Sequence, residues 1–251
     1  MIRYLLPVLM VWLCCGSAAA HDKRAKVEAR AARFVQFQEW GSANAMYMLL
    51  VDYAPQEAMP YARAMVTNGL LGDDAAQVGL LEMTQKHGIS LDSIFAEVHA
   101  FAYEIGESQE YAEFLKIVKE RQPWMSRNIN MRLLKYYDFR NDAPNMVAVA
   151  AELLVATPDD VNFLLSQGRG YMLQADYDNA VTVYKRVLKL DADNIDALLA
   201  LGNYYYVMWK EAEGTRSQFT ETRNLARHYL DKANALQSTP FVTAILKELA
   251  E

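Results

Sequence analysis

The feature that most constrains the fold of this chain is a period of 34 residues. Four tyrosines recur at that interval: Tyr103, Tyr137, Tyr171 and Tyr205. In three of the four cases a small residue lies three positions earlier: Ala100, Gly168 and Gly202. A fixed period of about 20–50 residues is typical of repeat proteins, in which each unit buries its apolar face against its neighbours. The period therefore predicts a stack of similar units.

The composition indicates that these units are helical. The chain is rich in Ala, Leu, Met, Glu, Gln and Lys, and no stretch alternates Val, Ile and Thr as a strand would. The prolines that follow the first 20 residues fall between apolar runs, where they can begin or end helices. These prolines are Pro55, Pro60, Pro123, Pro144, Pro158 and Pro240. We therefore expect an all-α fold.

The best-formed unit spans residues 161–194. Its characteristic positions are Leu164, Gly168, Tyr171, Tyr177, Ala180, Tyr184 and Leu188. This pattern resembles the tetratricopeptide repeat, a helix-turn-helix unit of the same length. Ala192 stands where that family usually has Pro. The resemblance implies that Gly168 lets the second helix approach closely and that Tyr171 fills the adjacent groove.

The resemblance extends over nearly all of residues 21–251. About six units begin near residues 24, 58, 92, 126, 160 and 194, and the best formed are 127–160, 161–194 and 195–239. Residues 58–126 depart most from the pattern. The last unit carries an insertion at about 209–220, its second helix is expected over 221–236, and residues 240–251 are expected to form a capping helix. The fold implied is a single α-solenoid, wound as a right-handed superhelix.

The first 20 residues have the pattern of a cleaved signal peptide. Arg3 is followed by an apolar run over residues 4–15 and by small residues up to Ala20. The run is too short to span a bilayer, and no membrane span is expected elsewhere. The sequence thus predicts export, most simply to the bacterial periplasm. Lipid anchoring at Cys14 or Cys15 and secretion are the alternatives.

The residue types disfavour nucleic-acid binding, metal binding and catalysis. The formal net charge is -6, with no long basic run. Both cysteines lie in the predicted signal peptide, and the histidines lack ligand spacing. Those histidines are His21, His87, His99 and His228. We expect no catalytic residue, no metal and no cofactor, because no nucleophile–base motif is present.

Two short segments suggest chemistry but fit the repeat better. Residues 168–170 read Gly-Arg-Gly, without the third glycine or preceding strand of a dinucleotide site and without the lysine of a phosphate-binding loop. We interpret Gly168 as a packing position. Gly170 is expected to lower the stability of its helix locally, a loss that the helix tolerates. The acidic segment over residues 191–196 does not match a calcium loop. There Asp193, Asn194 and Asp196 are expected to cap and charge the next helix.

The resemblance also indicates where a partner would bind. In this family the first helix of each unit lines the concave surface, and the residue after the small packing position points inward. Lys135, Arg169 and Asn203 hold that position, and Asn128, Arg132 and Asn162 lie on the same helices. This polar and basic strip predicts a peptide or protein partner carrying acidic groups. A solvated charged face with no ligand is the alternative.

Tyr206 and Trp209 form a second candidate contact. They lie three residues apart on one helix face, and either packing on the insertion or recognition of a partner fits them. The sequence therefore predicts a non-catalytic scaffold or adaptor of the cell envelope. The alternatives are a structural subunit of an envelope or secretion assembly, and an enzyme or ligand-binding solenoid with its site near residues 209–220.

Overall fold

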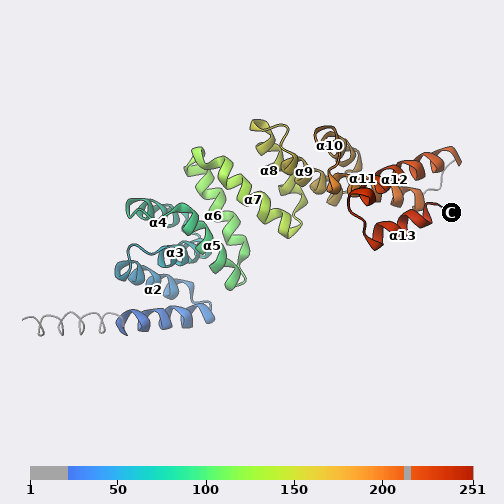
Figure 1. Ribbon diagram of the computed structural model, residues 1–251. Coiled ribbons are helices and arrows are strands. Elements are labelled where there is room, and N and C mark those ends of the chain that lie inside the picture. Colours follow the sequence, from blue (N-terminus) through green and yellow to red (C-terminus); the bar gives the residue numbers. More distant parts are fainter. Residues whose placement is uncertain (1–21, 212–215, 251) are drawn as a thin grey trace, which may run out of the picture. The chain divides into compact units, whose positions relative to one another are not determined.

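The computed structural model describes residues 22–211 and 216–250, and the side chains of residues 216–219 are not part of that description. Throughout these ranges the chain forms helices joined by turns, with no strand (Figure 1). The predicted signal peptide over residues 1–20, with Cys14 and Cys15, lies outside the described residues. So does His21. The prediction of export therefore stays a prediction.

The helices follow one another as consecutive pairs. The first pair is the helix over residues 22–36 and α2 (Trp40–Tyr53). The following pairs are α3 (Ala58–Leu70) with α4 (Asp74–Lys86), α5 (Leu91–Glu104) with α6 (Ser108–Arg121), α7 (Ser126–Arg140) with α8 (Ala143–Ala156), α9 (Val161–Leu173) with α10 (Tyr177–Leu190), and α11 (Ile195–Glu211) with α12 (Arg216–Leu236). A 3₁₀ turn, η1 (Pro123–Met125), precedes α7, and α13 (Pro240–Glu248) follows the last pair. The predicted all-α fold of about six helix-turn-helix units with a capping helix is confirmed.

The chain divides into two compact units. The first ends at Ile129 and the second begins at Asn130, so the boundary falls inside α7. Each unit has its own buried side chains, and each is described by itself below. Continuation of one right-handed superhelix through the whole chain stays a prediction.

Acidic and amide side chains begin the helices of the second unit. An Oδ1 atom of Asp160 accepts hydrogen bonds from the backbone N–H groups of Asn162 and Phe163 at 3.0 and 3.3 Å. Asn194 accepts from the N–H of Ala197 at 3.1 Å. Such caps satisfy N–H groups that have no partner within the helix. The segment over residues 191–196 thus supplies a helix cap, as predicted.

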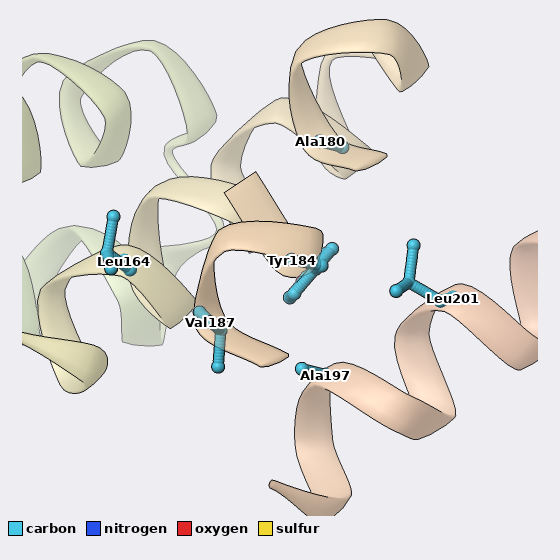
Figure 2. Packing of buried hydrophobic residues seen from close by; sticks show 6 residues of the cluster. All are labelled: Leu164, Ala180, Tyr184, Val187, Ala197 and Leu201. Carbon is cyan, nitrogen blue, oxygen red and sulfur yellow. The ribbon is translucent and has the colours of Figure 1, made fainter. Parts of the chain in front are cut away.

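The core of the second unit joins neighbouring repeats. Figure 2 shows a buried cluster to which α9, α10 and α11 all contribute: Leu164, Ala180, Tyr184, Val187, Ala197 and Leu201. Because α10 belongs to one repeat and α11 to the next, the cluster buries the face that one helix pair alone would leave exposed.

Close helix packing explains three glycines of this unit. A Cβ atom at Gly168 would lie 3.0 Å from the ring of Tyr184, and one at Gly202 would lie 2.6 Å from Cγ of Leu230. Their predicted packing role is confirmed. The interpretation of Gly170 as a residue that only lowers helix stability is wrong, because a Cβ there would lie 2.7 Å from Cγ2 of Val147 on α8. Gly170 is a packing position too, against the preceding repeat.

Tyr184 gives the second unit a testable response to alkaline pH. Burial raises the pKa of Tyr184 to about 12, whereas an unfolded tyrosine titrates near about 10. Between these values the unfolded chain loses its proton first, so stability falls as pH rises from about 10 to 12, by up to about 3 kcal/mol. We expect Tyr184→Phe to show a shallower loss over this range in urea unfolding at several pH values. Equal slopes in the two proteins would contradict the assignment.

The 34-residue period misplaces one tyrosine of the first unit. Tyr103 is 50% exposed, whereas Tyr137 is 4% exposed and Phe101 is 1% exposed. Tyr103 stands later in α5, which begins at Leu91, than Tyr171 stands in α9, which begins at Val161. The packing role predicted for Tyr103 is therefore wrong, and Phe101 fills that place.

The first unit also buries polar side chains, which explains why residues 58–126 fit the repeat pattern poorly. Gln77 is 1% exposed, and its Nε2 donates to the carbonyl oxygen of Met65 at 2.8 Å. Buried Thr67 donates to the carbonyl oxygen of Arg63 at 2.9 Å. Asn44 on α2 donates to Oδ1 of Asn68 at 2.7 Å. Hydrogen bonds here replace part of the apolar packing expected of a repeat.

The predicted insertion lengthens both helices of the last pair. Helix α11 continues to Glu211, and α12 begins at Arg216, earlier than the expected residue 221. Both helices run on because no proline interrupts this segment. Residues 212–215 lie outside the described ranges.

Candidate functional site

Three consecutive first helices carry the predicted contact positions. Lys135 on α7 and Arg169 on α9 are exposed, whereas Asn203 on α11 is half-buried. Each follows a buried position: Leu134, Gly168 and Gly202. Gly168 and Gly202 pack against the second helix of their own pair. All three residues belong to the second unit, which begins at Asn130.

Arg169 is held by the end of α7 and by the turn that follows it. Its Nη1 forms an ion pair and hydrogen bond with Oδ1 of Asp138, and its Nη2 donates to Oδ1 of Asn141 at 2.7 Å. Asn141 adopts the left-handed backbone conformation, with a positive φ of 54°. The hydrogen bond from Arg169 therefore stabilises the turn that contains Asn141. About half of each paired side chain is exposed, at 45% for Arg169 and 41% for Asp138. The guanidinium is thus oriented in advance and still reaches solvent.

Asn203 lies in an apolar cavity of about 330 Å³. The lining residues come from α9, α10 and α11: Met172, Tyr177, Ala200, Asn203, Tyr204, Val207, Met208 and Glu211. Oδ1 of Asn203 is buried and has no hydrogen-bond partner among the described residues. A buried acceptor without a partner costs free energy. We call this cavity the α9–α11 groove.

Helical spacing joins the groove to the predicted contacts. Arg169 and Met172 are three residues apart on α9, and Ala200, Asn203 and Val207 are spaced by three and four on α11. Residues at these spacings share one face of a helix. The basic position Arg169 and the apolar lining of the α9–α11 groove therefore belong to the same side of the first helices.

The other predicted contacts are distributed more widely. Arg132 is half-buried on α7, and Asn162 is exposed at the start of α9. Asn128 is exposed but belongs to the first unit, which ends at Ile129. Only Arg132 and Asn162 therefore share a unit with Lys135, Arg169 and Asn203. A contact role for each of them stays a prediction.

Tyr206 and Trp209 face the capping helix. The Tyr206 hydroxyl donates to Oε2 of Glu248 at 2.6 Å and accepts from Lys210 at 3.0 Å. These contacts hold the pKa of Glu248 below its usual value. Trp209 packs on the cluster of α12 and α13 side chains, and the Arg223 guanidinium lies 5.9 Å from its ring centre. Of the two interpretations, the structure supports packing, and recognition by this pair stays a prediction.

Neither a metal centre nor a membrane helix is found in the described part of the chain. Its His, Cys, Asp and Glu side chains form no group of three or more that could hold a metal ion. Its helices include none long and apolar enough to span a bilayer. Two of the histidines make ring contacts. The ring centres of His99 and Tyr111 lie 4.8 Å apart, and those of His87 and Tyr61 lie 6.2 Å apart.

Paired helices with close contacts at glycines, within a pair and between repeats, define the class of this molecule as a helical-repeat protein. Residues 168–208 match the family model described as TPR repeat. The resemblance to the tetratricopeptide repeat that was drawn from the residues is thereby confirmed for this segment. The matched segment includes Arg169, Asn203 and most of the α9–α11 groove. No curated protein sequence matches this chain.

Several solved structures are similar to this chain at low identity. The protein MamA is 17% identical, covers 74% of this chain and 96% of its own length, and has a TM-score of 0.47. A tetratricopeptide repeat protein from Parabacteroides merdae is 11% identical, covers 92% of this chain and 100% of its own length, and has a TM-score of 0.40. YrrB, described as a TPR protein with an unusual peptide-binding site, is 14% identical. It covers 87% of this chain and 88% of its own length, with a TM-score of 0.34.

Sequence reasoning found the polar side of this surface and missed its apolar side. Met172, Val207 and Met208 are not among the contacts predicted from sequence, although Val207 and Met208 are 46% and 42% exposed. A usable signal was present, since Ala200, Asn203 and Val207 recur at helical spacing on the face that carries Asn203. An apolar face on a first helix that is not needed for the core is a candidate contact surface.

Proposed function

We propose that this protein is a non-catalytic scaffold of the cell envelope that binds a peptide or protein segment along α7, α9 and α11. The observation that carries the proposal is the α9–α11 groove, where an apolar lining surrounds the unpaired Oδ1 of Asn203. Apolar pockets with a few oriented polar groups are typical of ligand sites. Tetratricopeptide repeats are in general interaction modules and not catalysts, which supports the same conclusion.

The chemistry of the groove defines the partner. An apolar side chain would fill the space beside Met172 and Val207, and a backbone N–H would satisfy Oδ1 of Asn203. Glu211 lines the same cavity and disfavours a carboxylate there. An acidic group of the partner would instead lie near Arg169 and Lys135. The partner is therefore an extended segment with an apolar residue next to an acidic one.

The proposed place of action is the periplasm. It is supported by the sequence of residues 1–20, in which a basic residue, an apolar run and small residues follow one another as in a signal peptide. The proposal makes the protein an exported adaptor.

Crosslinking mass spectrometry in the native host tests the groove. We expect Lys135→Glu with Arg169→Glu to lose its captured partners by about tenfold or more, because a hydrogen bond to a charged group contributes about 1.5–3 kcal/mol. The matched control is Arg186→Glu. Like Arg169, Arg186 forms an ion pair with the preceding repeat, at 3.0 Å to Asp159 in the turn before α9, but it lies on the second helix α10.

The control separates binding from folding. If the wild type and the double variant capture the same partners in equal amounts, the groove is not the binding site. If Arg186→Glu loses them equally, the effect reflects the loss of an ion pair between repeats, and the proposal also fails. Asn203→Leu fills the cavity and removes the acceptor, and we expect it to abolish capture with the charges intact.

A further inference from the structure

The first helix of the described chain carries a one-sided row of cations. Lys23, Lys26, Arg30 and Arg33 are spaced by three and four residues, and Phe37 continues the same spacing. All five side chains are exposed. Residues at this spacing share one face of a helix. We call these five residues the basic stripe, which extends about 15 Å from Lys23 to Arg33 at 1.5 Å per residue.

A different side of the same helix faces the rest of the first unit. Ala31 is 1% exposed, so it turns toward the rest of the first unit. Arg24 binds Glu57 at 2.6 Å and Glu28 at 2.8 Å. These hydrogen bonds and charges lower the pKa of Glu57. The helix is thus anchored through Arg24 and Ala31, and the basic stripe lies on its exposed side, where Met46 of α2 borders the same hollow as Arg30 and Arg33.

The stripe occupies a face that another repeat uses for packing. Gln38 and Ala175 end the first helices of their pairs with positive φ values of 56° and 58°. Aligned on these residues, Arg33 takes the place of Gly170. Gly170 packs against Val147 of the preceding helix α8. The basic stripe therefore lies where a preceding repeat would pack, and cations there leave that end of the first unit solvated.

Solvation alone does not explain the sign of the charge. A terminal repeat needs a polar outer face, and acidic or neutral residues provide one equally well. This chain has a formal net charge of -6, yet the helix over residues 22–36 carries five Lys and Arg residues against two acidic ones. Lys26 pairs with Asp22 at 2.6 Å, and no ion pair in the described part of the chain uses Arg30 or Arg33.

Apolar side chains lie beside the unpaired arginines. A surface hollow of about 550 Å³ is lined by Arg30, Arg33, Phe34, Phe37, Glu39 and Met46. The hollow is open to solvent, and Phe37 is 61% exposed. Arginines next to an exposed aromatic ring are the pattern of a surface-lying membrane contact, in which cations meet headgroups and the ring enters the interface.

We propose that the basic stripe docks the protein on a membrane surface of anionic phospholipid. A straight row of cations on the outside of one helix, with the exposed ring of Phe37 at its end, fits a planar array of phosphates over an apolar layer. Each basic residue near such a surface gives roughly a fivefold gain in partitioning. The proposal is independent of the α9–α11 groove, because that groove lies in the second unit.

Vesicle co-sedimentation of the protein purified from its native host tests the proposal. The probes are vesicles of about 30% phosphatidylglycerol in phosphatidylcholine and vesicles of phosphatidylcholine alone. We expect binding to the anionic vesicles to be at least tenfold tighter, and to weaken strongly at high salt because the Debye length shortens. The phosphatidylcholine arm measures any apolar contribution of the segment before residue 22.

Charge reversal on the stripe is compared with the same reversal elsewhere. We expect Arg30→Glu with Arg33→Glu to remove the preference for anionic vesicles, and Phe37→Ser to weaken binding severalfold. The control is Lys185→Glu with Lys189→Glu, which changes the net charge equally on exposed positions of α10. Retained folding is checked by circular dichroism, since all the substituted side chains are exposed.

Three outcomes overturn the proposal. The first is equal binding of the wild type to both kinds of vesicle. The second is equal loss in the control, because net charge and not the stripe would then govern binding. The third is binding of a polyglutamate peptide that Arg30→Glu with Arg33→Glu abolishes, without any binding to anionic vesicles. In that case the occupant is an acidic protein segment.

Discussion

Leu201→Ala is expected to lower the free energy of unfolding of the second unit by about 3 kcal/mol, within the range of about 2–5 kcal/mol for buried leucines. Leu201 is 0% exposed and lies on α11 in the cluster that also holds Tyr184 and Val187 of α10 (Figure 2). Truncation leaves a cavity between two repeats, which a stack of rigid helix pairs cannot close easily.

The matched control is Leu190→Ala. Leu190 ends α10 and is 45% exposed, so its truncation should change stability by no more than about 0.5 kcal/mol. Urea unfolding followed by circular dichroism measures both variants. Similar losses in the two proteins would mean that the α10–α11 contact does not stabilise the fold, contrary to the buried cluster.

Most of the fold could be predicted from sequence because the contacts that define a repeat are local. Gly168 and Tyr184 lie on the two helices of one pair, and their spacing in the sequence is fixed by two helix lengths and one turn. The prediction was wrong at Tyr103, whose place was derived from the 34-residue interval along the chain and not from the start of its helix. At Tyr103 a small difference in helix register moves the side chain off the packing face, and Phe101 takes its place.

The polar contacts of the first unit could not be predicted in the same way. Gln77 reaches a carbonyl oxygen on the neighbouring helix α3, and Asn44 on α2 reaches Asn68 on α3. Nothing in the spacing of Gln77 or Asn44 distinguishes them from solvated residues. Their burial follows from how α2, α3 and α4 meet, which is a property of packing and not of periodicity.

In the candidate site, too, some features follow from the repeat period and others depend on how the helices pack. The positions Lys135, Arg169 and Asn203 followed from the repeat register, which the structure reproduces in α7, α9 and α11. The engagement of Arg169 by Asp138 and Asn141 did not follow, because it depends on the turn that the preceding helix pair forms. The cavity around Asn203 also depends on three helices meeting. Sequence thus located the surface, and only the packed structure showed its shape.

Gly170→Ala is expected to destabilise the protein, whereas Gly79→Ala is expected to stabilise it. Both glycines lie inside helices, so alanine gains up to about 1 kcal/mol of helix propensity at each. At Gly79 on α4 an added Cβ would meet no atom within 4 Å apart from its chain neighbours and the backbone of its own helix, so the gain should appear undiminished. At Gly170 the added Cβ would lie 2.7 Å from Cγ2 of Val147 and 3.3 Å from the carbonyl oxygen of Ala143.

The strain at Gly170 should exceed the gain in propensity. The neighbours are a β-branched side chain, which is stiff in a helix, and a backbone atom. Overpacking of this kind costs about 1–3 kcal/mol or somewhat more, so we expect a net loss of about 1–2 kcal/mol in urea unfolding. A gain at Gly170 equal to that at Gly79 would mean that α8 and α9 can separate at no cost.

A double-mutant cycle identifies the contact responsible. Val147→Ala removes the methyl group that the new Cβ would meet, so Gly170→Ala should cost less in that background than in the wild type. We expect a favourable coupling of about 1 kcal/mol, within the range found for residues in contact. If the cost of Gly170→Ala is the same in both backgrounds, the backbone approach to Ala143 carries the strain. The glycine would then be required by the separation of the two helices and not by one side chain.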